Sequence, residues 1–252
     1  MGEGVTRPSR RPLGLMAALV VFATTAGAVE CKNQTFDSVQ MTACRVDLHR
    51  EPLALYWRDE AGKPYAQLST LRESLAKQRK TLAFAMNAGM YQEDLSPLGL
   101  FVSEHRELVR LNRRTGLGNF YQPPNGVFLV DEQGARVLTT EEYAAASPHP
   151  LLATQSGPIL VHQGSITESA VMSPQSTSLR IRNGVCAPSP DVAVFVISDS
   201  PVNFYGFAKF FLEQLGCREA LYLDGSISGL YAPSIGREDY GRDLGPMFGV
   251  IQ

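Results

Sequence analysis

The chain has 252 residues, of which 44% are hydrophobic and 19% charged, and its formal net charge is −2 at pH 7. This length is sufficient for one domain with a substantial core. The slight negative charge, without a Lys/Arg stripe, argues against nucleic acid as a partner. We find no internal repeat and no low-complexity linker, so the sequence predicts a single domain.

The N-terminal segment has the pattern of an export signal. Three arginines precede an apolar stretch at residues 13–23, and Ala26-Gly27-Ala28 has the small-x-small form of a signal-peptidase site. We therefore expect a signal peptide at residues 1–28 and a periplasmic or secreted domain at residues 29–252. The paired arginines Arg10-Arg11 leave a twin-arginine signal as one export route. Because a spanning helix needs about 20 apolar residues, we expect no stable membrane anchor; an uncleaved anchor is the alternative.

In chain order, apolar alternation after this segment predicts many strands and few helices. Residues 68–78 carry leucines at helical spacing and predict an amphipathic helix. The turn Asp-Glu-Gln-Gly at residues 131–134 predicts a hairpin, and Thr139 is suited to cap a short helix. Further strands are expected at residues 53–57, 81–86, 99–102, 126–130 and 158–161.

The four cysteines all lie after the predicted signal peptide. An even number of cysteines in an oxidising compartment favours disulfides, and three pairings are formally possible. We favour Cys31 with Cys44, because a short loop closes easily, and Cys186 with Cys217, because both flank the elements of the candidate site. No Cys-x-x-Cys spacing supports the alternative, a thiolate metal site.

The C-terminal third contains two apolar segments that each end at a carboxylate. Residues 192–197 are continuously apolar and lead into Asp199, and the short segment 221–223 leads into Asp224. Between them, residues 206–216 carry large apolar side chains at helical spacing. In a right-handed parallel crossover the two strands would lie side by side, which predicts that Asp199 and Asp224 are neighbours. The alternative is that Asp224 only caps a turn.

The stretch 206–228, which contains Leu-Gly-Cys-Arg-Glu-Ala-Leu-Tyr-Leu-Asp-Gly-Ser-Ile-Ser, resembles the C-terminal signature of the phosphodiester glycosidase family. The best-known members of this family uncover mannose 6-phosphate by removing N-acetylglucosamine from a sugar-phosphate diester. The resemblance extends over about residues 83–252. Its other matching segments, in the expected order, are Asn87-Ala88-Gly89-Met90-Tyr91 with Pro97-Leu98-Gly99, Ser156-Gly157-Pro158-Ile159-Leu160-Val161 with Gly164, Arg180-Ile181-Arg182-Asn183-Gly184-Val185, and the run ending at Asp199.

The chain departs from the family pattern at two places. Asp224-Gly225-Ser226-Ile227-Ser228 stands where the family usually has Asp-Gly-Gly-Gly-Ser, and Asn87-Ala88-Gly89 stands where it has Asn-Gly-Gly. Replacing glycine narrows the backbone conformations available beside the carboxylate. A different substrate, a more restricted pocket or a loss of activity would each follow from this change.

The resemblance implies an α+β fold, a single domain with a twisted, mostly antiparallel or mixed sheet and packed helices. It also implies a pocket that gathers segments distant in the sequence. We assign catalytic roles to Asp224, Arg180 and Asp199. The residues expected to bind substrate are Asn87, Gly89, Tyr91, Ser156, Gly157, Arg182, Gly225, Ser226 and Ser228.

The chemistry of a sugar 1-phosphodiester suggests a role for each type of side chain. Arg180 offers a planar fork to two phosphate oxygens; Arg182 is its rival, and strand alternation would put both on one face. Asp224 would act as nucleophile or stabilise the developing sugar cation, and Asp199 would orient Arg180 or serve as a second carboxylate. The histidines share no spacing or motif, so no metal or cofactor is expected.

The amide and hydroxyl groups of the other segments are suited to the sugar. Asn87 can donate to and accept from sugar hydroxyls or an N-acetyl group. Tyr91 can stack on a sugar face, and Ser156 with the Gly157 N–H can contact an oxyanion. Each of these residues also has a structural interpretation, as a turn or core residue.

Three classes of function remain. The first is an exported hydrolase that cleaves the glycosyl-phosphate bond of a sugar 1-phosphodiester in an envelope glycan or glycoconjugate. The second is a catalytically silent glycan- or sugar-phosphate-binding protein on the same fold. The third is a metal-dependent phosphodiesterase that uses Asp199 and Asp224 and cuts phosphorus–oxygen bonds. In each case the partner is a sugar-phosphate or glycan; the sequence predicts no oligomeric state.

Overall fold

The computed structural model describes residues 1–2, 29–169, 171–224 and 227–252. The predicted signal peptide therefore lies almost entirely outside the described residues, as do Gly225 and Ser226 of the predicted site. No helix within the described part of the chain is long and apolar enough to cross a membrane.

The largest sheet has seven strands, counted over the described residues, in the order β1-β2-β13-β12-β14-β10-β11. Every paired neighbour in it runs antiparallel. Its strands are β1 (Glu30–Phe36), β2 (Val39–Asp47), β10 (Ile159–His162), β11 (Ser165–Ile166), β12 (Asn183–Ser189), β13 (Val192–Ser198) and β14 (Ala220–Asp224).

Two further antiparallel sheets have five strands each within the described ranges, in the orders β16-β15-β4-β17-β3 and β6-β5-β9-β7-β8. The first contains β3 (Leu53–Tyr56), β4 (Leu82–Asn87), β15 (Leu230–Ala232), β16 (Arg237–Glu238) and β17 (Met247–Ile251). The second contains β5 (Phe101–Ser103), β6 (Arg106–Val109), β7 (Gly126–Asp131), β8 (Gly134–Thr139) and β9 (Leu152–Ser156). The predicted hairpin is confirmed, because Asp131 and Gly134 close the β7–β8 pair.

The three sheets pack their inner faces around a shared core of phenylalanines. Phe195 of β13 lies 5.2 Å from Phe84 of β4, 6.0 Å from Phe128 of β7 and 4.8 Å from Phe248 of β17, measured between ring centroids. Tilted and edge-to-face pairs at this spacing are favourable. One aromatic cluster therefore holds a strand from each sheet, which fixes how the strand ends of all three sheets meet.

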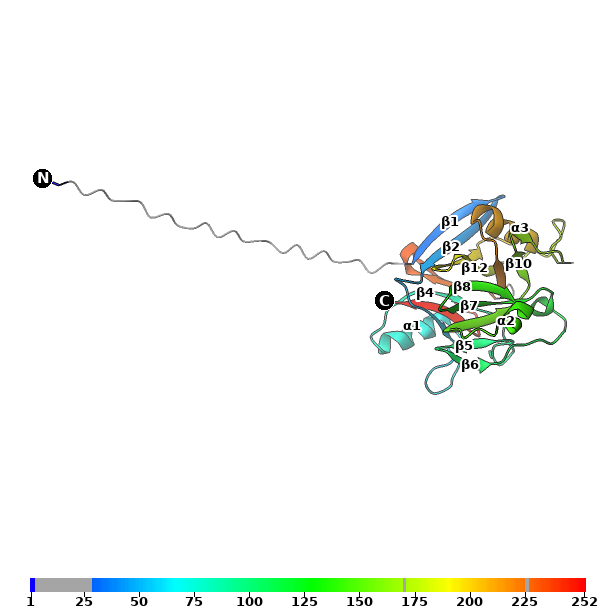
Figure 1. Ribbon diagram of the computed structural model, residues 1–252, viewed down its shortest axis with the longest axis horizontal. Coiled ribbons are helices and arrows are strands. Elements are labelled where there is room, and N and C mark those ends of the chain that lie inside the picture. Colours follow the sequence, from blue (N-terminus) through cyan, green and yellow to red (C-terminus); the bar gives the residue numbers. More distant parts are fainter. Residues whose placement is uncertain (3–28, 170, 225–226) are drawn as a thin grey trace.

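Each sheet carries a helix on its outer face, so its central strands are buried on both sides. The helix α1 (Leu68–Lys77) packs on β4, α2 (Thr140–Ala146) on β7 and β8, and α3 (Phe204–Lys209) over the seven-stranded sheet. Figure 1 shows α1 and α3 on opposite sides of the molecule. Burial on both faces explains why residues 192–197 are continuously apolar rather than alternating. The short helical turns are η1 (Asn119–Tyr121), η2 (Phe210–Gln214) and η3 (Pro233–Ile235).

Two predicted helix ends are confirmed in detail. Thr139 caps α2: its hydroxyl accepts from the Glu142 N–H at 3.0 Å, while the Glu142 carboxylate accepts from the Thr139 N–H at 2.8 Å. This reciprocal capping box satisfies two amide groups at the helix start. At the predicted 206–216 helix, α3 begins earlier, at Phe204, and continues as the π-helical turn η2 before Gly216, whose φ is +65°.

The antiparallel part of the predicted fold is confirmed, but the described chain contains more strand and less helix than a sheet with packed helices suggests. The predicted side-by-side crossover is wrong. β13 and β14 do run in the same direction, yet β12 lies between them and pairs antiparallel with both. The order of strand, helix and strand along residues 192–224 does not indicate a third strand between β13 and β14, because β12 precedes β13 in the sequence.

Both favoured disulfide pairings are confirmed. Cys31 and Cys44 face each other on β1 and β2, and their sulfurs are bonded. Cys186 of β12 is bonded to Cys217, which follows η2 and precedes β14. The second bond therefore ties the α3–η2 segment to the sheet that carries Asp224.

Candidate functional site

Polar residues at the ends of four strands meet where the three sheets come together. Asn87 ends β4 and Ser156 ends β9, while Asn183 begins β12 beside Asp224 at the end of β14. The side chains of Asn87, Ser156 and Asn183 are fully buried, and Asp224 is 8% exposed. We call these four residues the strand-end junction. Because buried polar groups are costly unless they are paired, their hydrogen bonds decide what each one can do.

Asn183 is the centre of the junction. Its Nδ2 donates to the Asn87 carbonyl at 2.9 Å and to Asn87 Oδ1 at 3.1 Å. Its Oδ1 accepts from the Asp224 N–H at 2.9 Å and from the Ser228 hydroxyl at 3.4 Å. A single amide side chain thereby fixes the end of β14 relative to the end of β4.

Asn87 and Ser156 use their polar atoms to hold backbone. Asn87 Oδ1 accepts from the Gly229 N–H at 2.9 Å and its Nδ2 donates to the Ile227 carbonyl at 3.0 Å. Ser156 Oγ donates to the Leu223 carbonyl at 2.6 Å. These bonds position the segment around Asp224, and direct contact of either side chain with a sugar stays a prediction.

Gly89 and Gly157 are required by close approach of backbones. A Cβ at Gly89 would lie 2.3 Å from the Gln155 carbonyl oxygen, and one at Gly157 would lie 2.8 Å from the Phe120 carbonyl oxygen. No side chain fits at such distances without moving the strands. Gly89 therefore lets the end of β4 approach β9 of another sheet, and Gly157 lets the end of β9 approach the turn η1; contact of either glycine with substrate stays a prediction.

Tyr91 and Tyr222 lie within the electrostatic field of Asp224. Burial raises the pKa of Tyr91, and the negative charge of Asp224 raises it further. Burial also raises the pKa of Tyr222; Arg182 opposes this, and Asp224 adds to it. The Tyr91 hydroxyl donates to the Asp243 carbonyl at 2.8 Å. Both phenols therefore stay neutral at physiological pH.

The two arginines of the Arg-x-x-x-Gly segment have different environments. Arg182 is buried, with Nε donating to the Val202 carbonyl and Nη2 to the Ser178 carbonyl, each at 2.8 Å. Its Nη1 donates to the Tyr222 hydroxyl at 3.2 Å, and its guanidinium lies 3.7 Å above the Phe204 ring. Burial lowers the pKa of Arg182, which Tyr222 opposes. These contacts hold Arg182 in the core, and its role as the rival phosphate ligand stays a prediction.

Arg180 is exposed, and its Nη1 donates to the neighbouring Leu179 carbonyl at 2.8 Å. The expectation that both arginines share a face is wrong, because residues 180–182 lie outside β12 and alternation holds only within a strand. Arg180 meets the rest of the fold through a single β-bridge to Val202.

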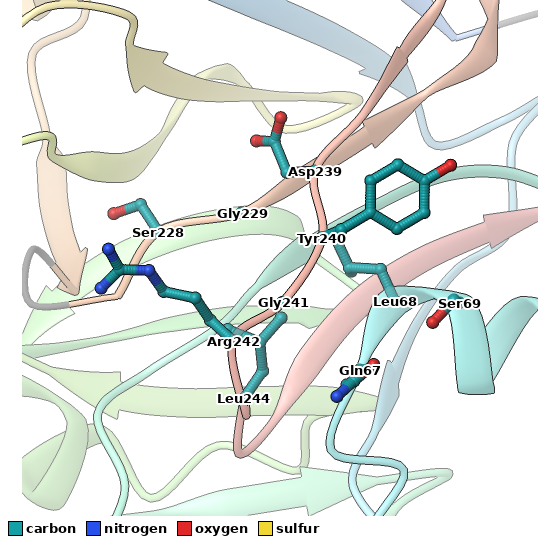
Figure 2. A pocket seen from close by; sticks show the side chains of 10 residues that line it. All are labelled: Gln67, Leu68, Ser69, Ser228, Gly229, Asp239, Tyr240, Gly241, Arg242 and Leu244. Atoms are coloured by element: carbon teal, nitrogen blue, oxygen red, sulfur yellow. The ribbon is translucent and has the colours of Figure 1, made fainter.

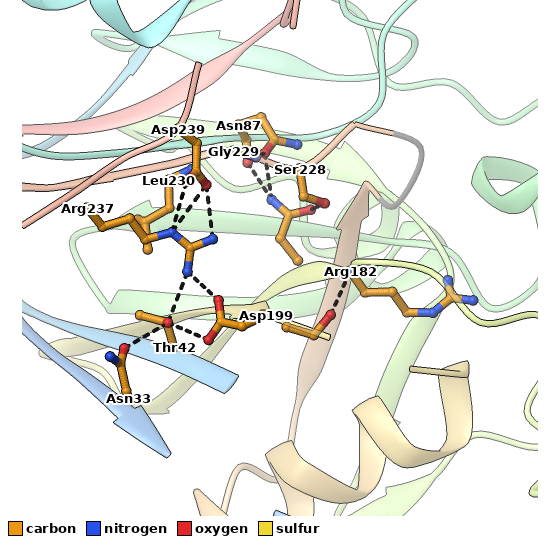
Figure 3. A network of polar contacts seen from close by, with 12 residues as sticks. Asn33, Thr42, Asn87, Arg182, Asp199, Ser228, Gly229, Leu230, Arg237 and Asp239 are labelled. Atoms are coloured by element: carbon orange, nitrogen blue, oxygen red, sulfur yellow. Dashed lines mark hydrogen bonds and ion pairs between the residues drawn. The ribbon is translucent and has the colours of Figure 1, made fainter. Parts of the chain in front are cut away.

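Asp199 has a partner that the sequence did not suggest. Its carboxylate forms an ion pair with Arg237 and accepts from the Thr42 hydroxyl at 2.8 Å. Arg237 also pairs with Asp239 at 3.0 Å, and Asp239 accepts from the Leu230 N–H at 2.9 Å (Figure 3). Asp199 therefore pairs with Arg237 in place of the expected Arg180, and this network joins the seven-stranded sheet to the segment after Gly229.

A pocket opens beside the junction and shares Ser228 and Gly229 with the segment that Asn87 and Asn183 hold. Figure 2 shows the guanidinium of Arg242 beside the Ser228 side chain at the rim of this pocket. The lining residues are Gln67, Leu68, Ser69, Ser228, Gly229, Asp239, Tyr240, Gly241, Arg242 and Leu244.

The sequence interpretation missed Asn183, Arg237 and Arg242. The role of Asn183 could have been predicted, because an asparagine that begins an apolar strand is buried and needs hydrogen-bond partners. Arg237 and Arg242 follow no periodic pattern, and their places depend on pairing between distant strands. Among the described residues, no three His, Cys, Asp or Glu side chains gather in a way that could hold a metal ion.

Comparisons with known proteins agree with this architecture. An uncharacterized Escherichia coli K12 protein, YigE, is 32% identical over 232 residues, which cover 92% of this chain and 89% of YigE. The catalytic domain of zebrafish N-acetylglucosamine-1-phosphodiester alpha-N-acetylglucosaminidase, auto-inhibited by its pro-peptide, superposes with a TM-score of 0.63 at 14% identity, covering 90% of this chain and 84% of that one.

A hypothetical protein from Synechocystis has the same fold, with a TM-score of 0.54 at 15% identity, covering 88% of this chain and 61% of that one. The sequence profile of the phosphodiester glycosidase family matches residues 80–250, which include all four residues of the strand-end junction. The chain therefore belongs to the phosphodiester glycosidase family.

Proposed function

We propose that the protein is an exported hydrolase that cleaves the glycosyl-phosphate bond of a sugar 1-phosphodiester in an envelope glycan or glycoconjugate. The observation that carries this proposal is the position of Asp224. Its carboxylate ends a buried strand and its backbone is fixed by Asn183, within the part of the chain that matches a phosphodiester glycosidase family. A nearly buried carboxylate held at one position is suited to stabilise positive charge on a sugar.

In the proposed reaction, the bond between the anomeric carbon and the phosphate oxygen breaks. Its electron pair leaves with the phosphate, and Asp224 meets the cation that develops on the sugar, as nucleophile or as counter-charge. Water then adds its oxygen to the sugar. Arg180, which is exposed and forms no ion pair with another described residue, would neutralise the departing phosphate.

Two features support export. The segment at residues 1–28 has the pattern of a signal peptide, and the folded domain carries two disulfides. Structural disulfides persist in oxidising compartments and are rare in the cytosol. We therefore place the reaction in the periplasm or outside the cell, where envelope glycans are accessible.

One observation favours a second candidate, a silent glycan- or sugar-phosphate-binding protein. Ile227 stands where the family usually has glycine, and it packs against the apolar cluster under α1. This contact anchors Ile227, three residues after Asp224, against the core. The metal-dependent phosphodiesterase has less support, because the Asp199 carboxylate is already paired with Arg237 and is not an open ligand beside Asp224.

An aryl N-acetylglucosamine 1-phosphodiester assayed with and without a chelator, in water enriched in ¹⁸O, tests these alternatives. The glycosidase proposal expects chelator-insensitive turnover with the label on the sugar. Label on the phosphate together with loss of activity in chelator would support the metal phosphodiesterase. Binding of the sugar phosphate without turnover, in a preparation of confirmed fold, would support the silent binding protein.

A further inference from the structure

The segment that follows β16 is fixed to the body of the protein directly after Arg242. The Tyr91 hydroxyl donates to the Asp243 carbonyl at 2.8 Å, and the Leu244 N–H donates to the Ala66 carbonyl at 2.6 Å. The Leu244 side chain is buried, and Gly241 has a φ of +84°, a conformation that favours glycine. The backbone at residue 242 is thereby held in one place.

The Arg242 side chain, in contrast, is exposed and is not used by the fold. It forms no ion pair with any residue that the structure describes. Its guanidinium points along the rim of the pocket toward Ser228, whose hydroxyl donates to the Asp224 carbonyl at 3.1 Å (Figure 2). A fixed backbone thus presents a free cation beside the segment that follows Asp224.

The charges of both Asp224 and Arg242 act on Tyr91. Burial is the largest cause of the raised pKa of Tyr91; the charge of Asp224 adds to it, and the charge of Arg242 opposes it. One phenol therefore feels both the Asp224 carboxylate and the Arg242 guanidinium.

Two of the other arginines, Arg182 and Arg237, are already engaged, and the exposed Arg180 does not line this pocket. Arg182 is buried with its nitrogens on two carbonyls and a phenol, and Arg237 compensates the carboxylates of Asp199 and Asp239. The acidic pair nearest the pocket is therefore partly neutralised by Arg237. An anion entering the pocket would meet Arg242 with its guanidinium fork free.

We propose that Arg242 binds the phosphate group of the substrate at the rim of this pocket. The inference rests on the proposed phosphodiester substrate and adds to it the position of the phosphate, on the Ser228 side of Asp224. Because the contact is made in the bound substrate as well as during bond cleavage, its loss should raise KM more than it lowers kcat.

The test compares Arg242→Ala, Arg242→Lys and, as matched control, Arg114→Ala, which removes an equally exposed guanidinium on a different loop. Two readouts are used: KM and kcat on the aryl sugar phosphodiester and on the uncharged aryl glycoside of the same sugar, and calorimetric binding of N-acetylglucosamine 1-phosphate. We expect Arg242→Ala to raise KM for the diester and weaken sugar-phosphate binding on the order of 10–100-fold, with the uncharged glycoside unaffected.

Arg242→Lys should recover part of this loss, because an ammonium keeps the charge without the fork, and Arg114→Ala should match the wild type. Unchanged sugar-phosphate binding in Arg242→Ala would overturn the inference, as would a wild-type protein that binds no sugar phosphate. A wild type that binds sugar phosphate through Arg242 but turns over no diester would support the inference while contradicting the proposed hydrolase. Failure of the inference about Arg242 and failure of the proposed hydrolase function therefore give different results.

Discussion

Asn183 accepts a hydrogen bond from the backbone N–H of Asp224 at 2.9 Å while it donates to the Asn87 carbonyl. The backbone of the candidate catalytic residue is therefore held by a side chain two strands away in sequence. The alternative that Asp224 only caps a turn concerns residues 225 and 226, which lie outside the described residues.

The first prediction concerns this asparagine. Asn183→Ala removes the partner of the Asp224 N–H and of the Asn87 carbonyl, both buried, so the free energy of unfolding should fall by about 2–4 kcal/mol. Urea denaturation measures it. Asn119→Ala, on the turn η1, serves as control and should stay within about 0.5 kcal/mol of the wild type. An Asn183→Ala variant with the unfolding free energy of the wild type would show that other contacts hold the junction.

Much of the fold was predictable where local patterns decide the structure. The apolar run of β13, the β7–β8 hairpin and the Thr139 cap all follow from residues adjacent in sequence. The neighbours of β14 were not predictable in this way. β12 pairs with β13, the next strand in the sequence, but its pairing with β14 joins segments distant in sequence, and the apolar pattern of β12 does not specify this second partner.

The site was predictable to a similar extent. Asp224 ends a strand, as expected, and lies with Asn87 at one junction through Asn183. The roles of the arginines could not be predicted from the sequence. Strand alternation does not apply to the irregular residues 180–182, and Arg237 and Arg242 lie in a segment without periodicity. Tertiary contacts determine where these charged side chains lie, and such contacts cannot be predicted from the local pattern of a single sequence.

The second prediction separates Arg180 from Arg182. Arg182→Ala should destabilise the protein by about 3 kcal/mol, because it removes the guanidinium that donates to the Val202 and Ser178 carbonyls and covers the Phe204 ring. Arg180→Ala should leave the unfolding free energy within about 0.5 kcal/mol of the wild type and weaken turnover of the diester. Denaturation and steady-state kinetics on both variants check this. Equal stability of the two variants would contradict the structural role of Arg182.

The third prediction concerns the disulfides. The 31-residue separation of Cys186 and Cys217 exceeds the 13-residue separation of Cys31 and Cys44. In the loop-entropy model the two bonds contribute about 3.7 and 2.9 kcal/mol. Replacing both cysteines of a pair by alanine should lower the melting temperature more for Cys186 and Cys217, measured by calorimetry. Wild-type protein with four free thiols would contradict both pairings.

The fourth prediction is a pH dependence at Glu51, which is buried and accepts from the Asp47 N–H at 2.8 Å. Burial raises the pKa of Glu51, and the nearby charge of Asp47 adds to this, against the Asp47 hydrogen bond and the arginines at positions 45 and 50. A pKa raised in the folded state means that stability is full below the unfolded pKa and is lost as pH rises through the folded one.

Glu51→Gln keeps an acceptor for the Asp47 N–H and removes the buried charge, so it should raise the melting temperature at pH 7. This gain should shrink as pH falls through the raised pKa of Glu51 and be absent below the ordinary value of 4.5, where the wild-type carboxyl is itself neutral. Glu60→Gln, at an exposed position, is the control and should show no such pH-dependent gain. A gain of the same size at pH 3 and pH 7 would contradict burial of the charge as its cause.

The last prediction concerns Asp224. Asp224→Asn keeps the size of the side chain and leaves the backbone N–H that Asn183 accepts, so the fold should be retained. If the carboxylate meets the developing sugar cation, kcat on the phosphodiester should fall on the order of 10²–10⁴-fold, while binding of the sugar phosphate persists or tightens because a negative charge has been removed beside it. Rapid-quench kinetics and calorimetry on the same preparation separate these quantities. A variant with wild-type kcat would show that Asp224 takes no part in the chemical step. Equal losses of binding and rate would show instead that Asp224 binds substrate.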